Sequence, residues 1–197
     1  QCIGTDAAGN VYRLAIENST ASSGPVSIAV SLRADHCATW QTVGSIAGFA
    51  LDLTVAPDGA LFAVGNRSAT VSGRAFFWQS LDAGVTWTVS DPSVGLSSVL
   101  LSTDVAAGNT GAVYVCGSSG GRWLVRKGQR TVSGINWTTV DNLPGVQAES
   151  VCVRPATVPG QLDDVLVSGY SSGKWTVRRS ANGGATWTTI NSYPTGI

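Results

Sequence analysis

Four tryptophans at nearly equal spacing divide the chain into four similar parts. Trp40, Trp87, Trp137 and Trp187 are separated by 47, 50 and 50 residues, and each is followed by a β-prone tail such as Thr188-Thr189-Ile190. A period of this length indicates that one supersecondary unit is repeated along the chain. The 197 residues are therefore expected to form a single domain of four repeats. The approximate bounds of the repeats are 1–46, 47–95, 96–145 and 146–197.

Each repeat contains four short stretches that are typical of β-strands. An apolar stretch comes first, as at 51–55, and a strand led by glycine follows, as at 59–62. A third stretch is aromatic or β-branched, as at 123–126, and the fourth is the tail after the tryptophan. The 24 glycines and only 12% charged residues suit short strands joined by tight turns. Four antiparallel strands are the content of one propeller blade, so the predicted fold is all-β, a β-propeller of four blades.

The turn before each tryptophan carries a recognisable pattern. The segment 80–87 has the full pattern Ser-x-Asp-x-Gly-x-Thr-Trp, and 180–187 has it with asparagine in place of aspartate. The segments 33–40 and 130–137 keep only parts of it. The pattern resembles the Asp-box, or BNR, repeat of sialidases, sortilin-type receptors and several secreted glycoside hydrolases. The residues that carry the resemblance are Asp35, Trp40, Ser80, Asp82, Gly84, Trp87, Gly134, Trp137, Ser180, Asn182, Gly184 and Trp187.

A structural role explains why these residue types occur in the turn. A short carboxylate or amide accepts hydrogen bonds from backbone N–H groups of its own turn, and glycine takes the positive φ that the loop needs. The tryptophan buries a large ring between strands or against the next blade. The resemblance implies the same, because Asp-boxes lie at the blade periphery in that family. We therefore expect Asp35, Asp82 and Asn182 to hold turns rather than to catalyse.

No catalytic residue is assigned from the sequence. The resemblance implies that a sialidase-like hydrolase would need an arginine cluster, a tyrosine activated by a glutamate, and an acid/base aspartate around a six-bladed channel. The chain has only two glutamates and four predicted blades. A nucleophilic triad is excluded because the only histidine, His36, lies inside an Asp-box-like turn and no Gly-x-Ser-x-Gly elbow occurs. Polar residues on inner strands more often line a hydrated channel. The weak catalytic candidates are Asp52, Asp104 and Glu149, in or beside predicted inner strands, and Arg154 in Val153-Arg154-Pro155.

Three tryptophans outside the repeated set raise the question of ligand binding. Trp123 and Trp175 occupy similar places in their repeats, which favours packing between blades. Trp78 is shifted in phase and is therefore predicted to be exposed, where its ring could stack on the face of a sugar. Trp78 is accordingly the ligand-binding candidate.

Four cysteines in a chain of low charge indicate an oxidising compartment. Cys2, Cys37, Cys116 and Cys152 form an even set, which favours two disulfides and a secreted or cell-surface protein. Three connectivities are open, and Cys2 with Cys37 and Cys116 with Cys152 are the most local pairings. No metal site is expected, because CxxC motifs and paired histidines do not occur. No cofactor is expected either.

The charge balance and hydropathy limit the classes of partner. Twelve basic residues balance twelve acidic ones, so neither nucleic acid nor an anionic membrane is an expected partner, and no apolar run is long enough to span a membrane. The first residues lack signal-peptide features, and the chain reads as a mature form. The predicted function is a secreted, non-catalytic module that binds a glycan or an extracellular protein, or serves as a structural subunit of an extracellular assembly. The alternative is a sialidase-like glycoside hydrolase or a fragment of one.

Four blades are few for the family that the turns resemble, whose propellers usually have six or more. An arc of four blades that does not close leaves two apolar faces, which something must cover. Three arrangements are open: a single four-bladed ring, which is the expectation, two chains that form an eight-bladed ring, or a head-to-tail assembly. The last two would make the protein a homo-oligomer or a filament joined through exposed blade edges.

Overall fold

A computed structural model describes residues 2–17, 27–33, 40–66, 75–109, 111–154, 156–158 and 160–194. Asp35 and Cys37 lie outside these residues, as does the side chain of Cys2. The turn predicted around Asp35 and the pairing of Cys2 with Cys37 therefore lie outside the described part of the chain.

All the described elements are β-strands, and they form four antiparallel sheets of four strands each. The first sheet contains β1 (Cys2–Thr5), β2 (Val11–Glu17), β3 (Ser27–Arg33) and β4 (Gln41–Ala47). The second contains β5 (Phe49–Val55), β6 (Leu61–Asn66), β7 (Ala75–Ser80) and β8 (Thr88–Ser90). The third contains β9 (Leu100–Ala107), β10 (Ala112–Ser119), β11 (Arg122–Thr131) and β12 (Gly134–Pro144). The fourth contains β13 (Gln147–Arg154), β14 (Asp164–Ser171), β15 (Lys174–Ser180) and β16 (Thr188–Pro194). The prediction of an all-β chain is confirmed.

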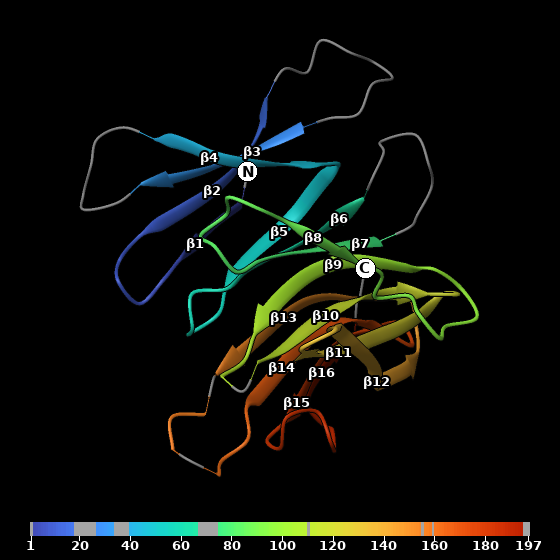
Figure 1. The fold of residues 1–197 in the computed structure, drawn as a ribbon. Coiled ribbons are helices and arrows are strands. Elements are labelled where there is room, and N and C mark those ends of the chain that lie inside the picture. The colour runs from blue at the N-terminus through green and yellow to red at the C-terminus, as the bar shows by residue number, and fades with distance from the viewer. Residues whose placement is uncertain are drawn as a thin grey trace.

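The sheets follow one another in chain order. The first strand of each sheet is the inner one, and β1 lies beside β5, β5 beside β9, and β9 beside β13. Figure 1 shows the first sheet, in blue, at the top of the view and the fourth, in orange and red, at the bottom. The described residues form an open arc and do not show the single four-bladed ring expected from the sequence. Ile3 of the first sheet and Ile190 of the fourth are 61% and 51% exposed, because none of the described sheets covers them.

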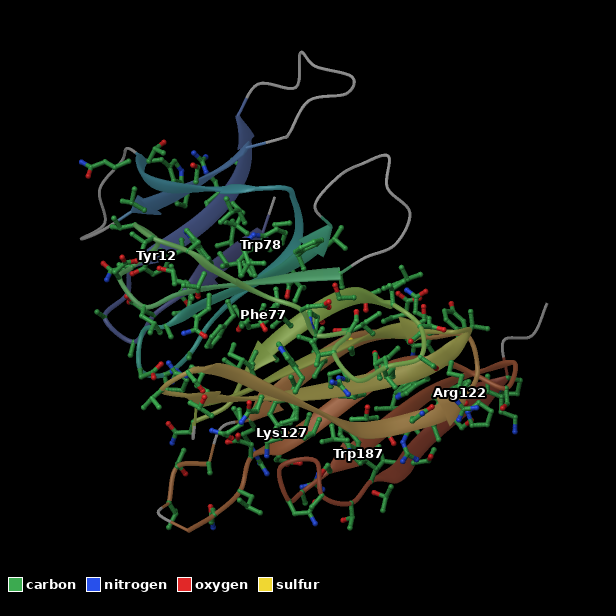
Figure 2. All side chains as sticks on the ribbon, turned by 45° about the vertical axis from the view of Figure 1, so that its right-hand side comes forward. Tyr12, Phe77, Trp78, Arg122, Lys127 and Trp187 are labelled. Atoms are coloured by element: carbon green, nitrogen blue, oxygen red, sulfur yellow. The ribbon has the colours of Figure 1, made fainter. Side chains whose placement is uncertain are left out.

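The core consists of three apolar clusters, one between each pair of consecutive sheets. Tyr12 of the first sheet packs with Trp78 of the second, and both lie among these strands in Figure 2. Phe77 of the second sheet packs with Val113 of the third, and Tyr114 of the third packs with Val165 of the fourth. Successive side chains of a strand point to opposite faces, so β10 sends Val113 to one neighbouring sheet and Tyr114 to the other. A strand covered on both faces is apolar almost throughout, as β10 is.

A buried ion pair joins the third sheet to the fourth. Asp141 in β12 accepts hydrogen bonds from Nε and Nη2 of Arg178 in β15, at 2.8 and 2.9 Å. The same carboxylate accepts the indole N–H of Trp123 at 3.1 Å. Arg126 holds the matching place one sheet earlier and donates to the carbonyl oxygens of Pro92 and Val94, at 3.0 and 2.7 Å. Arg178 therefore fixes its sheet to the preceding one, and Arg126 fixes its sheet to the loop that follows β8.

Replacing Asp141 with alanine is expected to lower the free energy of unfolding by about 3 kcal/mol, because the charged guanidinium of Arg178 then stays buried without its acceptor. Urea denaturation measures the change. The control is Arg154→Ala, which removes a surface ion pair whose arginine side chain is 75% exposed and should cost less than about 1 kcal/mol. Equal losses in the two variants would contradict the role of the buried pair.

Candidate functional site

The inner strands of three consecutive sheets carry matching β-bulges. In each of β5, β9 and β13 one extra residue interrupts the pairing with the second strand. Glycine on the second strand allows the bulged strand to lie close, because a Cβ at Gly117 would collide with the carbonyl oxygen of Leu101. The extra residues are Leu51, Thr103 and Glu149. The residues that follow them, in equivalent positions, are Asp52, Asp104 and Ser150.

Asp52 and Asp104 bind the backbone of neighbouring strands. Oδ2 of Asp52 accepts the N–H of Val105 in the third sheet at 3.1 Å, and the same N–H approaches Oδ1 of Asp104 at 2.9 Å. Oδ2 of Asp104 accepts the N–H of Val151 in the fourth sheet at 2.9 Å and the hydroxyl of Ser150 at 2.6 Å. Each aspartate thus links its own inner strand to the next one.

The two carboxyl groups lie close together, because an oxygen of each lies against the same N–H, that of Val105. The pKa of Asp52 is raised to about 7, first by burial and then by its interaction with Asp104, whereas the N–H groups of Val105 and Leu53 lower it. Asp52 can therefore take up or release a proton near neutral pH, as both catalytic and purely structural carboxyl groups do.

The other two candidates occupy different surroundings. Glu149 is the bulge residue of β13 and accepts the side-chain amide of Gln147 at 3.3 Å. Arg154 lies at the end of the same strand and donates to Asp164 at 2.7 Å, and Arg179 binds the same carboxylate. The structure therefore brings Asp52 and Asp104 into contact, whereas Arg154 belongs to a surface ion-pair cluster.

The turns at 80–87 and 180–187 have the same hydrogen-bond pattern. In the first, Asp82 accepts the Ser80 hydroxyl at 2.8 Å, the N–H of Thr86 at 2.8 Å and the Thr86 hydroxyl at 2.6 Å. These bonds lower the pKa of Asp82 to about 2. Gly84 has a φ of 91°, which glycine adopts without strain, and its carbonyl accepts the indole N–H of Trp87 at 3.0 Å.

The fourth-sheet turn repeats this pattern and contacts the third sheet. Asn182 accepts the Ser180 hydroxyl and the N–H of Thr186, both at 2.9 Å, and the carbonyl of Gly184 accepts the Trp187 indole at 3.1 Å. The neighbouring carbonyl of Gly183 accepts Nζ of Lys127 at 2.9 Å and the hydroxyl of Tyr114 at 3.1 Å. Figure 2 shows Lys127 and Trp187 in the region where these two sheets meet.

The first and third repeats differ in this region. Trp40 is half-buried and has the guanidinium of Arg13 stacked 4.3 Å from its ring centroid. In the third repeat a short hairpin joins β11 to β12, with Gly134 as the first residue of β12. Trp137 packs edge-on against Phe77 of the second sheet, with centroids 5.0 Å apart, and donates to the Ser90 hydroxyl at 2.9 Å.

The structure contradicts the prediction for Trp78. Its side chain is only 3% exposed, so it cannot stack on a sugar. By strand register Trp78 in β7 occupies the place that Arg178 holds in β15, facing the preceding sheet. Both residues lie nine positions before the tryptophan of their repeat, which is the sequence signal that could have located Trp78 in a sheet interface. The same alignment could have identified Arg178 and, in β12, its partner Asp141.

The cysteine pairing of Cys116 with Cys152 is also wrong. Both are free thiols: Cys116 is buried between the third and fourth sheets, and Cys152 is exposed. Burial raises the pKa of the Cys116 thiol, which lies 3.5 Å from the Thr103 hydroxyl. By strand register Cys116 is level with Asp104, whereas Cys152 lies two residues beyond the equivalent Ser150. The two thiols are therefore apart, because one is buried and the other exposed and because they lie at different levels along their strands.

A hollow of about 370 Å³ lies where the four inner strands end. Residues of all four sheets line it, so the arc curves about a common axis. The lining is mainly small and aliphatic, with threonine hydroxyls and one free thiol. Representative lining residues are Thr5, Thr54, Ala106, Val151 and Cys152.

The described residues contain no group of three or more His, Cys, Asp and Glu side chains placed to hold a metal ion. Within the same part of the chain, no helix has the length and apolar character needed to cross a membrane.

Comparison with known proteins gives a structural likeness only. No family model and no curated protein match the chain. Among solved structures, the chain is similar to the Hadza microbial sialidase Hz136, with a TM-score of 0.58 and 16% identity, over 98% of this chain and 46% of that one. It also aligns with the Niastella koreensis GH74 enzyme at a TM-score of 0.40 and 20% identity, over 97% of this chain and 31% of that one.

The likeness to the sialidase defines the class of fold. Successive four-stranded antiparallel sheets around an axis are the arrangement of a β-propeller, and the sialidase has this fold. The chain spans less than half of the sialidase, and at this level of identity the two share the fold alone.

The raised pKa of Asp52 predicts how stability depends on pH. Because this pKa is higher in the folded protein than in the unfolded chain, the folded state binds more protons between about pH 4 and pH 7, and stability falls over this range until the pH has risen through 7. Because water reaches part of the pair, we expect a loss of about 1–2 kcal/mol between pH 5 and pH 8. The Asp52→Asn variant should lack this loss, because its neutral amide can donate to Asp104.

Thermal and urea denaturation at pH 5 and pH 8 measure the dependence. Asp82→Asn is the matched control, because the pKa of Asp82 is about 2 and its replacement should leave the profile over this range unchanged. An identical pH profile for Asp52→Asn and the unmodified protein would refute the assignment.

Proposed function

We propose that the chain is a non-catalytic Asp-box propeller module that acts outside the cell by binding another macromolecule. The observation that carries this proposal is the engagement of Asp52 and Asp104. Their carboxyl groups accept the N–H groups of Val105 and Val151 in neighbouring sheets. These groups therefore serve to join sheets.

The same geometry argues against glycosidase chemistry at this pair. Glycosidases use two carboxyl groups about 5–10 Å apart, with the sugar or water between them. Asp52 and Asp104 both lie against the N–H of Val105, and Asp104 also accepts the N–H of Val151, so their oxygens are already engaged by the backbone. Arg154 lies at a strand end, where it donates to Asp164 and not to either member of this pair.

The turns at 80–87 and 180–187 support the Asp-box assignment. In both, the third residue accepts the serine hydroxyl and a threonine N–H, and the tryptophan indole donates to the glycine carbonyl. Two different acceptors, Asp82 and Asn182, make the same bonds, so the role needs an oxygen acceptor rather than an ionisable group. Secretion is part of the proposal and rests on the sequence alone.

The fourth sheet offers the surface best suited to binding. Tyr170 and Trp175 form an edge-to-face pair with centroids 4.7 Å apart, and neither is fully buried. A partly exposed aromatic pair suits the apolar face of a protein partner. It also suits the face of a sugar ring, so a glycan is the second candidate ligand.

Assays with a panel of aryl glycosides, including an aryl sialoside, are expected to show no turnover above the uncatalysed rate, because the paired carboxyl groups are committed to structure. Turnover that disappears in Glu149→Gln or Asp104→Asn, with the melting temperature retained, would establish the hydrolase alternative instead. A glycan array probed with the unmodified protein and with Trp175→Ala separates the two ligand classes: signals lost in the variant identify a glycan ligand on the fourth sheet.

A further inference from the structure

The three internal sheet interfaces use the same residue positions. On the inner strand, one position points toward the preceding sheet in every repeat. Leu53, Val105 and Val151 hold it in the second, third and fourth sheets and are 4%, 3% and 5% exposed. Ile3 holds it in the first sheet and is 61% exposed. The first sheet therefore presents a residue of interface type with no sheet against it.

The fourth sheet presents the opposite half of the same interface. The positions of β10 and β11 that face the following sheet hold Tyr114 and Trp123, both fully buried. By strand register Leu166 and Trp175 hold these positions in the fourth sheet, and both are only partly buried. Val177 likewise takes the place of the fully buried Val125.

The outer strand of the fourth sheet continues this face. Val140 and Leu143 of β12 pack in the cluster between the third and fourth sheets. Their equivalents in β16 are Ile190 and Tyr193, which are 51% and 53% exposed. Together with Leu166, Trp175 and Val177 they make up the free face of the fourth sheet. The equivalent positions are buried in the interfaces within the chain. An exposed, continuous apolar face is characteristic of an interaction surface.

We propose that the free face of the fourth sheet binds the first sheet of a second copy of this chain, head to tail. In the internal interfaces, the residues equivalent to Ile3 (Leu53, Val105 and Val151) pack against the preceding sheet. Ile3 of a second copy can pack against the free face of the fourth sheet in the same way. The chain has no net charge, so no overall repulsion opposes association. A heterologous contact of this kind either closes into a ring or continues as a filament, depending on the rotation between copies.

A polar contact supports the same register. Within the chain, the side chain after each bulge accepts an N–H from the following inner strand, as Asp52 does from Val105 and Asp104 from Val151. Ser150 holds this position in the fourth sheet and donates its hydroxyl to Asp104, so its oxygen can still accept a hydrogen bond. The equivalent donor in a second copy is the N–H of Ile3.

The inference rests on the proposed binding role and specifies the partner as a second copy of the chain. Light scattering coupled to size-exclusion chromatography tests this inference. The unmodified protein is expected to have at least twice the mass of one chain. Ile3→Glu and Trp175→Glu should each weaken association by about tenfold or more, because each places a charge in the interface. Val132→Glu, at an exposed hairpin turn, is the control and should leave the mass unchanged.

Mixing the two weakened variants distinguishes a head-to-tail contact from any other. The fourth sheet of the Ile3→Glu protein and the first sheet of the Trp175→Glu protein are both intact, so the mixture should recover a species of two chains that neither variant forms alone. Unchanged melting temperatures show that the variants fold. A monomeric unmodified protein, or a mass that is insensitive to both substitutions, would overturn the inference.

The same samples separate this inference from the proposed function. A monomer that still binds glycans keeps the binding role and rejects the second copy as partner. An oligomer that also hydrolyses aryl glycosides keeps the interface and rejects the non-catalytic role. A monomer that hydrolyses aryl glycosides rejects both.

Discussion

The requirement that each sheet be covered on its two faces governs this structure. A four-stranded sheet whose strands send side chains alternately to both sides is apolar on both, so it is stable only between neighbours. The second and third sheets meet this requirement, and β10 is buried along nearly its whole length as a result. The first and fourth sheets meet it on one side only, which is why exposed apolar residues such as Ile3 and Ile190 gather at the ends of the arc.

Polar side chains at the sheet interfaces help to set the register in which neighbouring sheets pack. Asp52 and Asp104 accept backbone N–H groups from the next inner strand, Arg178 reaches back to the preceding sheet, and Arg126 binds the loop that follows β8. A buried hydrogen bond to a charged group is costly to leave unmade, so these contacts favour one register between sheets over neighbouring ones. Two of the carboxyl candidates, Asp52 and Asp104, therefore belong to the inter-sheet framework, which supports the proposed function.

The errors in the sequence-based predictions have a common cause. The sequence predicts an exposed Trp78 because this residue is shifted in phase from Trp123 and Trp175. The structure places it instead at the position that Arg178 holds in the fourth sheet. An aromatic ring and a guanidinium can both fill this space between two sheets. Cys116 and Cys152 form one of the most local of the open pairings, but Cys116 faces the fourth sheet and Cys152 lines the hollow at the ends of the inner strands. In both cases the residue types gave no information about which face of a sheet, and which level along the strand, each side chain would occupy.

The sequence by itself determined the repeated unit. Its period, its glycines and its alternating β-prone stretches predict four antiparallel strands in each quarter of the chain, because these signals are local and act within a few residues. Only the tertiary structure decided what lies between the sheets and whether the ring closes. The contacts of Asp52 with Val105 and of Arg178 with Asp141 join residues of different repeats. Closure depends on the angle at which whole sheets pack, a property that no single repeat encodes. The four described sheets form an open arc whose two ends present apolar residues.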